Sequence, residues 1–187
     1  MIDHLKKLEQ LRGLQGRDAL FFAHLKQLKT WQQQRLAHTY RDLAADPRYA
    51  PAVEFFLEEL YGMEETALRD RDLIRMYPAI KRVLPGFAFE TVSKALELDL
   101  ISEEFDQALT RELAGVDITE AGYIAAFRAA GGERERMRQI DLMREVGAQL
   151  ERVVEKPLIY STLRMLRGPA RLAGLSHMQQ FLEKGFT

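Results

Sequence analysis

The chain has 187 residues, of which 47% are hydrophobic and 29% charged, and its formal net charge is −1. This composition excludes a disordered chain, and the near-zero charge gives no general attraction to nucleic acid or acidic membranes. The absence of cysteine excludes disulfides and thiolate chemistry, and no run approaches the roughly 18 apolar residues of a membrane span. We therefore expect a soluble cytoplasmic protein with a single domain over 1–187.

Helical periodicity runs through the first half of the chain. Residues 1–16 predict a peripheral amphipathic helix, and residues 18–45 a longer one with apolar positions at steps of three and four. Pro51 suits the first turn of the next helix. A further helix over 64–84 contains Pro78, which we expect to kink the helix or to restart it.

The second half continues the same pattern. Residues 89–101 predict one helix, and Ser102 is suited to cap a separate helix that follows. Thr119 predicts another N-terminal cap, with its helix ending at Gly131-Gly132. The sequence thus places several helix boundaries between residues 86 and 133.

Residues 133–154 form the longest regular stretch. Apolar residues recur along it at helical spacing, and we expect this face to point inward. It consists of Met137, Ile140, Met143, Leu150 and Val154. Charges of alternating sign predict a solvated opposite face, because such pairs contribute only a few tenths of a kcal/mol each. This second face consists of Glu135, Arg138, Asp141 and Arg144.

No segment alternates like a strand, and the remaining residues also predict helix. A helix opening at Pro157 runs through three arginines, and Ser176 is suited to cap a short last helix. We therefore predict an all-α fold, a bundle of about seven or eight antiparallel or crossing helices without a sheet.

Four blocks of the chain, residues 35–62, 69–85, 95–106 and 164–186, carry a family resemblance. The first contains the motif FFLEELYG and the last the motif FLEKGF. Together they resemble a family of uncharacterised proteobacterial proteins with an FFLxxLYG helix. The resemblance implies a bacterial, helical, soluble protein of unknown function, and it brings no catalytic residue with it. Members of that family continue beyond the last motif, so it also implies a C-terminal piece beyond Thr187.

No motif indicates a catalytic chemistry. None of the four histidines follows a Glu or Asp by three residues, as in di-iron bundles, and no HExxH sequence occurs. The GxSxG, SxxK and phosphate-binding glycine motifs are also missing. We expect no metal and no cofactor, and the sequence leaves open whether the chain is an enzyme.

One candidate site combines arginines and acids. Arg164, Arg167 and Arg171 fall on one helix face, with Pro169 as a possible break between them. Asp72 and Asp99 lie beside apolar positions, where a carboxylate needs a charged or hydrogen-bonding partner.

Three interpretations of this candidate anion or ion-pair cluster remain open. The arginines form an internal network with the acids of 69–72 or 97–106, they face solvent, or they bind an anion. Residues 51–110 supply the acids, with 13 Asp and Glu against 6 Lys and Arg. Nucleic acid is disfavoured as a partner, because the chain is near neutral and its aromatic residues follow core periodicity.

These observations favour a non-enzymatic helical-bundle protein that acts through protein–protein contacts, with itself as a homodimer or with another protein. The alternative is a bundle that binds a small molecule or anion, enzymatic or not. In that alternative Arg164, Arg167 and Arg171 hold the ligand beside Asp72 or Asp99.

Overall fold

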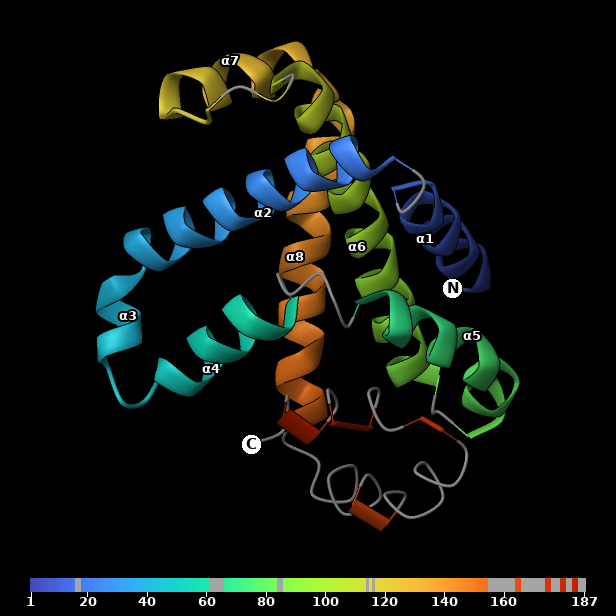
Figure 1. Cartoon of the computed structure of the whole chain (residues 1–187). Coiled ribbons are helices and arrows are strands. Elements are labelled where there is room, and N and C mark those ends of the chain that lie inside the picture. The colour runs from blue at the N-terminus through green and yellow to red at the C-terminus, as the bar shows by residue number, and fades with distance from the viewer. Residues whose placement is uncertain are drawn as a thin grey trace.

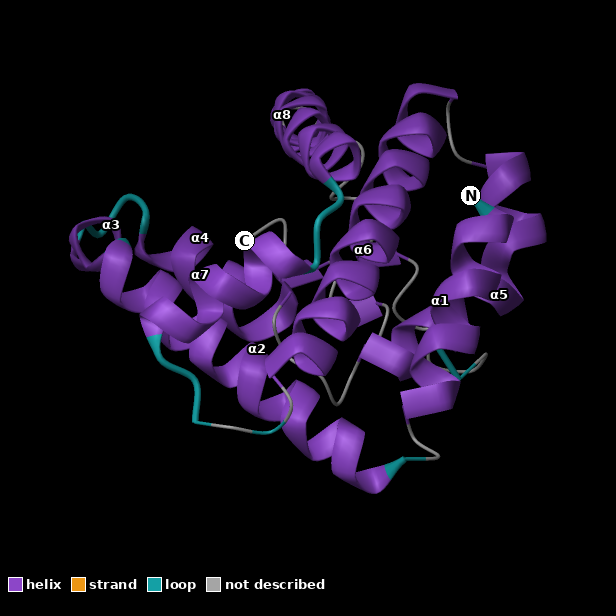
Figure 2. Cartoon of the chain, turned by 90° about the horizontal axis from the view of Figure 1, so that it is seen from above, coloured by secondary structure: helices purple, strands orange, loops and turns teal. Residues whose placement is uncertain are grey.

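The computed structural model describes residues 1–15, 18–60, 66–83, 86–113, 115, 117–154, 164–165, 174–175, 179–180 and 183–184. Its elements are α1 (Ile2–Gln15), α2 (Ala19–Thr39), α3 (Arg41–Ala45), α4 (Ala50–Phe55), the π-helical segment η1 (Phe56–Leu60), α5 (Thr66–Val83), α6 (Gly86–Leu113), α7 (Glu120–Ala129) and α8 (Glu133–Val154). The described ranges contain helices, turns and loops but no strand (Figure 2). The predicted all-α fold is confirmed.

The helix α6 lies at the centre of the molecule, and α8 runs antiparallel beside it (Figure 1). On one side α1 packs against both α5 and α6. On the other side α2, α3 and α4 form an arm that α2 joins to α6 (Figures 1 and 2). The helix α6 therefore packs against helices from both ends of the described helical region, α1 and α2 before it and α7 and α8 after it.

Several helix ends follow directly from local sequence. The Asp18 carboxylate accepts a 2.9 Å hydrogen bond from the Phe21 amide at the start of α2. Thr119 caps α7 by accepting a 3.1 Å bond from the Gly122 amide, as predicted. Pro51 lies in the first turn of α4, and Gly131 and Gly132 after α7 both have positive φ. These boundaries need only short-range interactions.

The predicted helix boundary at Ser102 is wrong, because α6 is one helix of 28 residues. The Ser102 hydroxyl donates to the Leu98 carbonyl at 2.8 Å, the back-bond that a serine makes inside a helix. Buried Leu100 and Glu103 flank it, so packing against other helices extends α6 past this point. Pro78 likewise lies inside the uninterrupted α5 and does not restart it.

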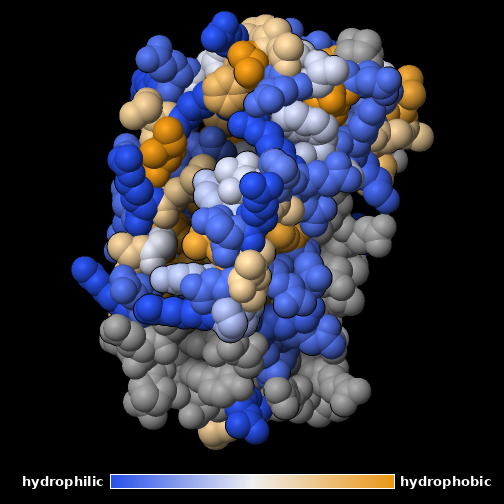
Figure 3. All heavy atoms as spheres, turned by 90° about the vertical axis from the view of Figure 1, so that its left-hand side faces the viewer, coloured by the Kyte–Doolittle hydropathy of each residue, from blue (hydrophilic) through white to orange (hydrophobic). Residues whose placement is uncertain are grey.

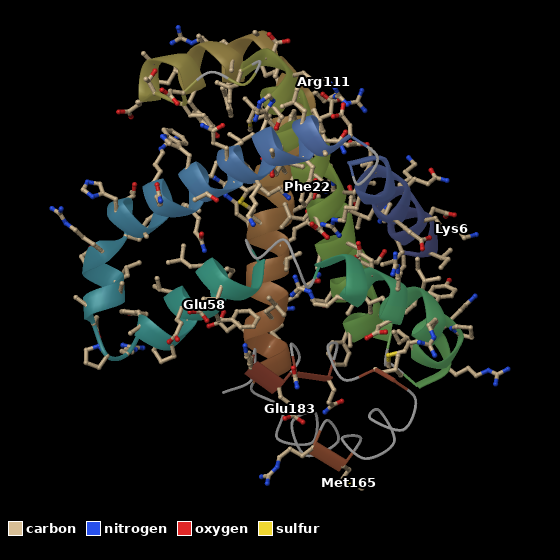
Figure 4. The ribbon with its side chains drawn as sticks, viewed as in Figure 1. Lys6, Phe22, Glu58, Arg111, Met165 and Glu183 are labelled. Atoms are coloured by element: carbon tan, nitrogen blue, oxygen red, sulfur yellow. The ribbon has the colours of Figure 1, made fainter. Side chains whose placement is uncertain are left out.

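Two clusters of buried apolar side chains hold the helices together. One consists of Leu5, Leu8, Leu96 and Leu100, and the other of Leu28, Leu109, Leu113 and Ala126. Each fully buried leucine contributes roughly 1.5–3 kcal/mol. The helix α1 has a larger share in the core than a peripheral helix would, since Leu5 and Leu8 are completely buried. Its Lys6 points away from the other helices (Figure 4).

The helix α8 presents a different face to α6 than its sequence pattern predicts. Leu142 and Val146 are its buried apolar residues. The predicted inward orientation is wrong for the four apolar residues that are between 39% and 53% exposed. They are Met137, Ile140, Met143 and Leu150. The side chain of Val154, the fifth residue of that face, lies outside the described set.

Polar contacts accompany this orientation of α8. Arg138, predicted to be solvated, donates to both carboxylate oxygens of Glu97 on α6, at 2.8 and 3.1 Å. Gln139 donates to the Ser102 hydroxyl at 2.8 Å. A mixed strip of α8, with these polar residues and with buried Leu142 and Val146, therefore faces α6, and the purely apolar strip lies on the outside.

Candidate functional site

Six charged side chains from four helices meet where α1, α2 and α5 converge on α6. We call this group the buried ion cluster, because five of its side chains are at most 17% exposed; the sixth, Asp99 at its edge, is 38% exposed. It consists of Arg12 from α1, Lys29 from α2, Asp70 from α5, and Asp99, Glu103 and Asp106 from α6.

Arg12 makes the largest number of these contacts. Its guanidinium donates to Asp70, to Asp99 at 2.8 Å, and to one oxygen of Glu103 at 3.3 and 3.4 Å. The Glu103 side chain is only 2% exposed. A planar guanidinium with five N–H donors can serve several carboxylates at once, which an ammonium group does less well. One arginine thus ties α1 to α5 and α6.

Lys29 holds the other end of the cluster. Its ammonium group lies 2.9 Å from Glu103 and 3.7 Å from Asp106. Gln32, one turn further along α2, donates to Asp106 at 3.0 Å. The helix α2 is therefore joined to α6 by a charge and a neutral amide, one turn apart.

Burial shifts the pKa values of the cluster. It raises the pKa of Asp106 to about 6, against the opposing effects of Lys29 and Gln32. It also raises the pKa of Asp70, although Arg12 opposes that shift. Burial alone would lower the pKa of Arg12, but the surrounding charges of Asp99, Asp70 and Glu103 outweigh it and raise that pKa. Arg12 therefore stays charged at any physiological pH.

The arrangement is suited to holding helices together. Asp70, Asp99, Glu103 and Asp106 each contact Arg12 or Lys29. Among the described residues, no group of three His, Asp or Glu side chains is placed to hold a metal ion. A buried group of this kind is costly to disrupt, because removal of one partner leaves an uncompensated charge. We interpret the buried ion cluster as a structural clamp.

The structure places the predicted site residues in different surroundings. Asp99 belongs to the buried ion cluster. Asp72 is buried on α5, and its Oδ2 atom has no hydrogen-bond partner within the described part of the chain. Arg164 is exposed, and Arg167 and Arg171 lie outside the described residues. The grouping of these five residues stays a prediction.

Sequence reasoning selected the acids of 97–106 but missed their cations, Arg12 and Lys29. The helical spacing of apolar residues in α1 and α2 could have indicated both cations. Arg12 lies four residues after buried Leu8, and Lys29 four residues after buried Leu25, so each continues an apolar helix face. A long basic residue on such a face can reach a buried acid.

A shallow depression of about 370 Å³ runs along α2 from Lys26 to Gln34, bordered by Asp117 and Ile118. Its Trp31 ring packs against Tyr123 with ring centroids 4.7 Å apart. No residue of the buried ion cluster borders this depression. The two features are therefore separate.

A second feature is the outward strip of α8, which we call the α8 seam. It comprises Ile140, Met143, Gly147 and Leu150, all on one side of the helix and all exposed. Viewed from above, α8 stands at the margin of the molecule beside α6 (Figure 2). Elsewhere, on the face that Figure 3 displays, hydrophobic atoms occur as patches among hydrophilic ones.

The fold and these side chains define an all-helical protein with an internal charge clamp and an exposed apolar helix face. The family described as Domain of unknown function (DUF8198) matches residues 12–187, and the chain belongs to this family. No curated protein and no solved structure matches the chain.

Proposed function

We propose that this protein is non-enzymatic and acts through protein–protein contacts made by the α8 seam. The single observation behind the proposal is the exposure of Ile140, Met143 and Leu150 on one face of α8. Scattered apolar residues on a surface need no explanation, but a continuous stripe of them indicates an interaction site.

The shape of the stripe supports a protein partner over a small ligand. The seam runs from Ile140 to Leu150, about 15 Å along the 22-residue helix α8. A narrow, convex apolar stripe fits another helix, whereas small ligands bind in concave sites. The residues that border the shallow depression on α2 include none from the seam.

The buried ion cluster supports the non-enzymatic part of the proposal. Its acids already contact Arg12 or Lys29, and Asp99, a residue of the alternative anion site, is one of them. A carboxylate whose oxygens already accept hydrogen bonds from a cation is less available to bind a ligand.

The proposal places the protein in the cytoplasm of a bacterium, in line with the cysteine-free composition and the family resemblance. None of the helices in the described ranges is long and apolar enough to cross a membrane.

Association of the purified chain, alone and after incubation with extract of its source cells, tests this proposal. Sedimentation velocity reports the mass of the complexes. We expect Met143→Lys to abolish association, because a lysine would be desolvated in the contact. Leu20→Lys is the matched control, since Leu20 is 68% exposed on α2. Equal association of the wild-type chain and the Met143→Lys variant would overturn the proposal.

A further inference from the structure

We propose that the α8 seam binds the α8 seam of a second copy of this chain, with the two helices antiparallel and crossing at Gly147. This inference rests on the proposed function, and it names a second copy of the chain as the protein that binds the seam. It follows from the spacing of the seam residues, from the position of one glycine, and from the charges that flank the stripe.

The spacing of the seam is that of a paired helix. Ile140, Met143, Gly147 and Leu150 are separated by three, four and three residues. This is the alternation of a two-helix coiled coil, in which a narrow stripe faces one partner. In contrast, buried Leu142 and Val146 face α6. The helix α8 therefore has one apolar strip for its own fold and another strip that the described residues leave exposed.

Gly147 is the second observation. An exposed glycine inside a helix costs roughly 1 kcal/mol relative to alanine. A Cβ atom placed on Gly147 would meet nothing within 4 Å, so packing within the described chain does not require a glycine there. At a helix crossing, a residue without a side chain lets two backbones approach closely, since the interaxial distance depends on the side chains at the contact. A helix crossing at Gly147 therefore accounts for a glycine at this position.

The charges beside the seam select the orientation. Arg144 is 77% exposed, and Glu151 on the same flank is also exposed. In an antiparallel pair centred near Gly147, Arg144 meets Glu151 of the second copy, and by symmetry the contact occurs twice. In a parallel pair Glu151 would instead lie beside Val146 of the second copy. The seam is thus self-complementary in charge only when the helices are antiparallel.

The apolar residues of the seam also pair with one another when the two helices are antiparallel. Met143 lies opposite Leu150 of the second copy, again twice, and the centre of this pairing, like that of the Arg144–Glu151 contact, lies within half a residue of Gly147. Methionine adapts to irregular contacts of this kind. The pairing therefore buries three of the exposed apolar side chains of each copy, Ile140, Met143 and Leu150, in one contact.

Disulfide trapping tests the geometry directly, because the chain contains no cysteine of its own. The Gly147→Cys variant, oxidised in dilute solution, is expected to form a covalent dimer, since the two Cα atoms at the crossing lie within disulfide reach. The Leu150→Cys variant is expected to stay monomeric under the same conditions, because its position faces Met143. Arg152→Cys, on the exposed flank away from the seam, is the control. Equal trapping at all three positions would overturn the geometry.

A charge swap tests the same contact without a covalent bond. Arg144→Glu turns both attractive contacts repulsive and is expected to raise the dimer Kd roughly tenfold. The double variant Arg144→Glu/Glu151→Arg is expected to restore the wild-type Kd. A loss of fold would not be rescued in this way, and absence of rescue counts against the proposal.

The mass of the wild-type chain in solution distinguishes whether the α8 seam binds a second copy, another protein or neither. A mass that rises with concentration from monomer to dimer supports the second copy. A monomer at every concentration that still retains another protein through Met143 overturns the dimer and leaves the proposed function intact. A monomer that retains none overturns both.

Discussion

At the scale of single residues, Arg12 has the most consequential contacts in the described structure. It is the charge that joins α1 to α5 and α6, and it contacts three carboxylates at once. An exposed arginine with one partner contributes little to stability, because water screens the interaction. A buried arginine among several acids differs, since its loss leaves their charges uncompensated in a poorly solvated place.

Arg12→Met should therefore lower the free energy of unfolding by about 3–5 kcal/mol. Urea denaturation at neutral pH measures the change. Arg134→Met is the matched control, and we expect it to stay within about 0.5 kcal/mol of the wild-type chain because Arg134 is exposed. A similar effect of both substitutions would show that the clamp contributes no more than a surface charge.

Asp106 should make the stability depend on pH in an unusual direction. Burial raises its pKa from 3.8 to about 6, so the folded chain binds this proton more tightly than the unfolded chain does. The contribution of Asp106 to the free energy of unfolding therefore falls as pH rises from about 4 to 6, by up to about 3 kcal/mol.

The difference between the wild-type chain and Asp106→Asn isolates this contribution, because the other acids titrate in both proteins. Chemical denaturation at several pH values between 4 and 7 gives the two curves. Glu104→Gln, at an exposed site on α6, is expected to leave the pH dependence unchanged. Parallel curves for the wild-type chain and Asp106→Asn would contradict a raised pKa.

At the scale of elements, the turn between α7 and α8 sets the direction of α8. Two glycines with positive φ, Gly131 and Gly132, reverse the chain there. Immediately beyond the turn, the Arg136 guanidinium lies 3.9 Å from the ring centroid of Phe105 and 3.5 Å from that of Phe127. This stacked cation connects α6, α7 and α8 at one point.

Substitution by alanine should lower the free energy of unfolding by different amounts at the two glycines. Both substitutions force an alanine into left-handed backbone, which costs roughly 1 kcal/mol. A Cβ atom on Gly131 meets nothing within 4 Å, but one on Gly132 would lie 2.7 Å from the Phe105 ring. We expect Gly132→Ala to cost about 1–3 kcal/mol more than Gly131→Ala, as overpacking does. Thermal unfolding monitored by circular dichroism compares the pair, and equal melting temperatures would argue against the close contact with Phe105.

At the scale of the whole molecule, the N-terminal helix is part of the core. Leu5 and Leu8 of α1 pack in one cluster with Leu96 and Leu100 of α6, and Leu73 and Ile74 of α5 pack against it. The family match begins at residue 12, so these two leucines precede the matched region. The described fold nevertheless depends on them.

Leu8→Ala should lower the free energy of unfolding by about 3 kcal/mol, because the cavity would form among α1, α5 and α6. Hydrogen exchange should also become faster at amides of α5 and α6, since these helices share the contact. Leu20→Ala, at a position 68% exposed, is the control. An effect limited to the amides of α1 would mean that this helix unfolds independently of the rest.

The sequence by itself determined the features that depend on neighbours within about four residues. These features are the helical periodicity, the cap at Thr119, Pro51 in the first turn of α4, and the reversal at Gly131 and Gly132. They suffice for the all-α fold, because each is a local property of the backbone and its adjacent side chains.

Only the tertiary structure decided the features that depend on distant residues. Arg12 reaches Glu103 across 91 positions of the sequence, and the acid run attracts whichever cation packing brings to it. The helix α8 has two apolar strips, and the strip with Leu142 and Val146, beside the hydrogen bonds to Glu97 and Ser102, is the one that is buried. Periodicity shows that a helix has an apolar face, but the choice among faces depends on the neighbouring helix, and that neighbour is set by the fold.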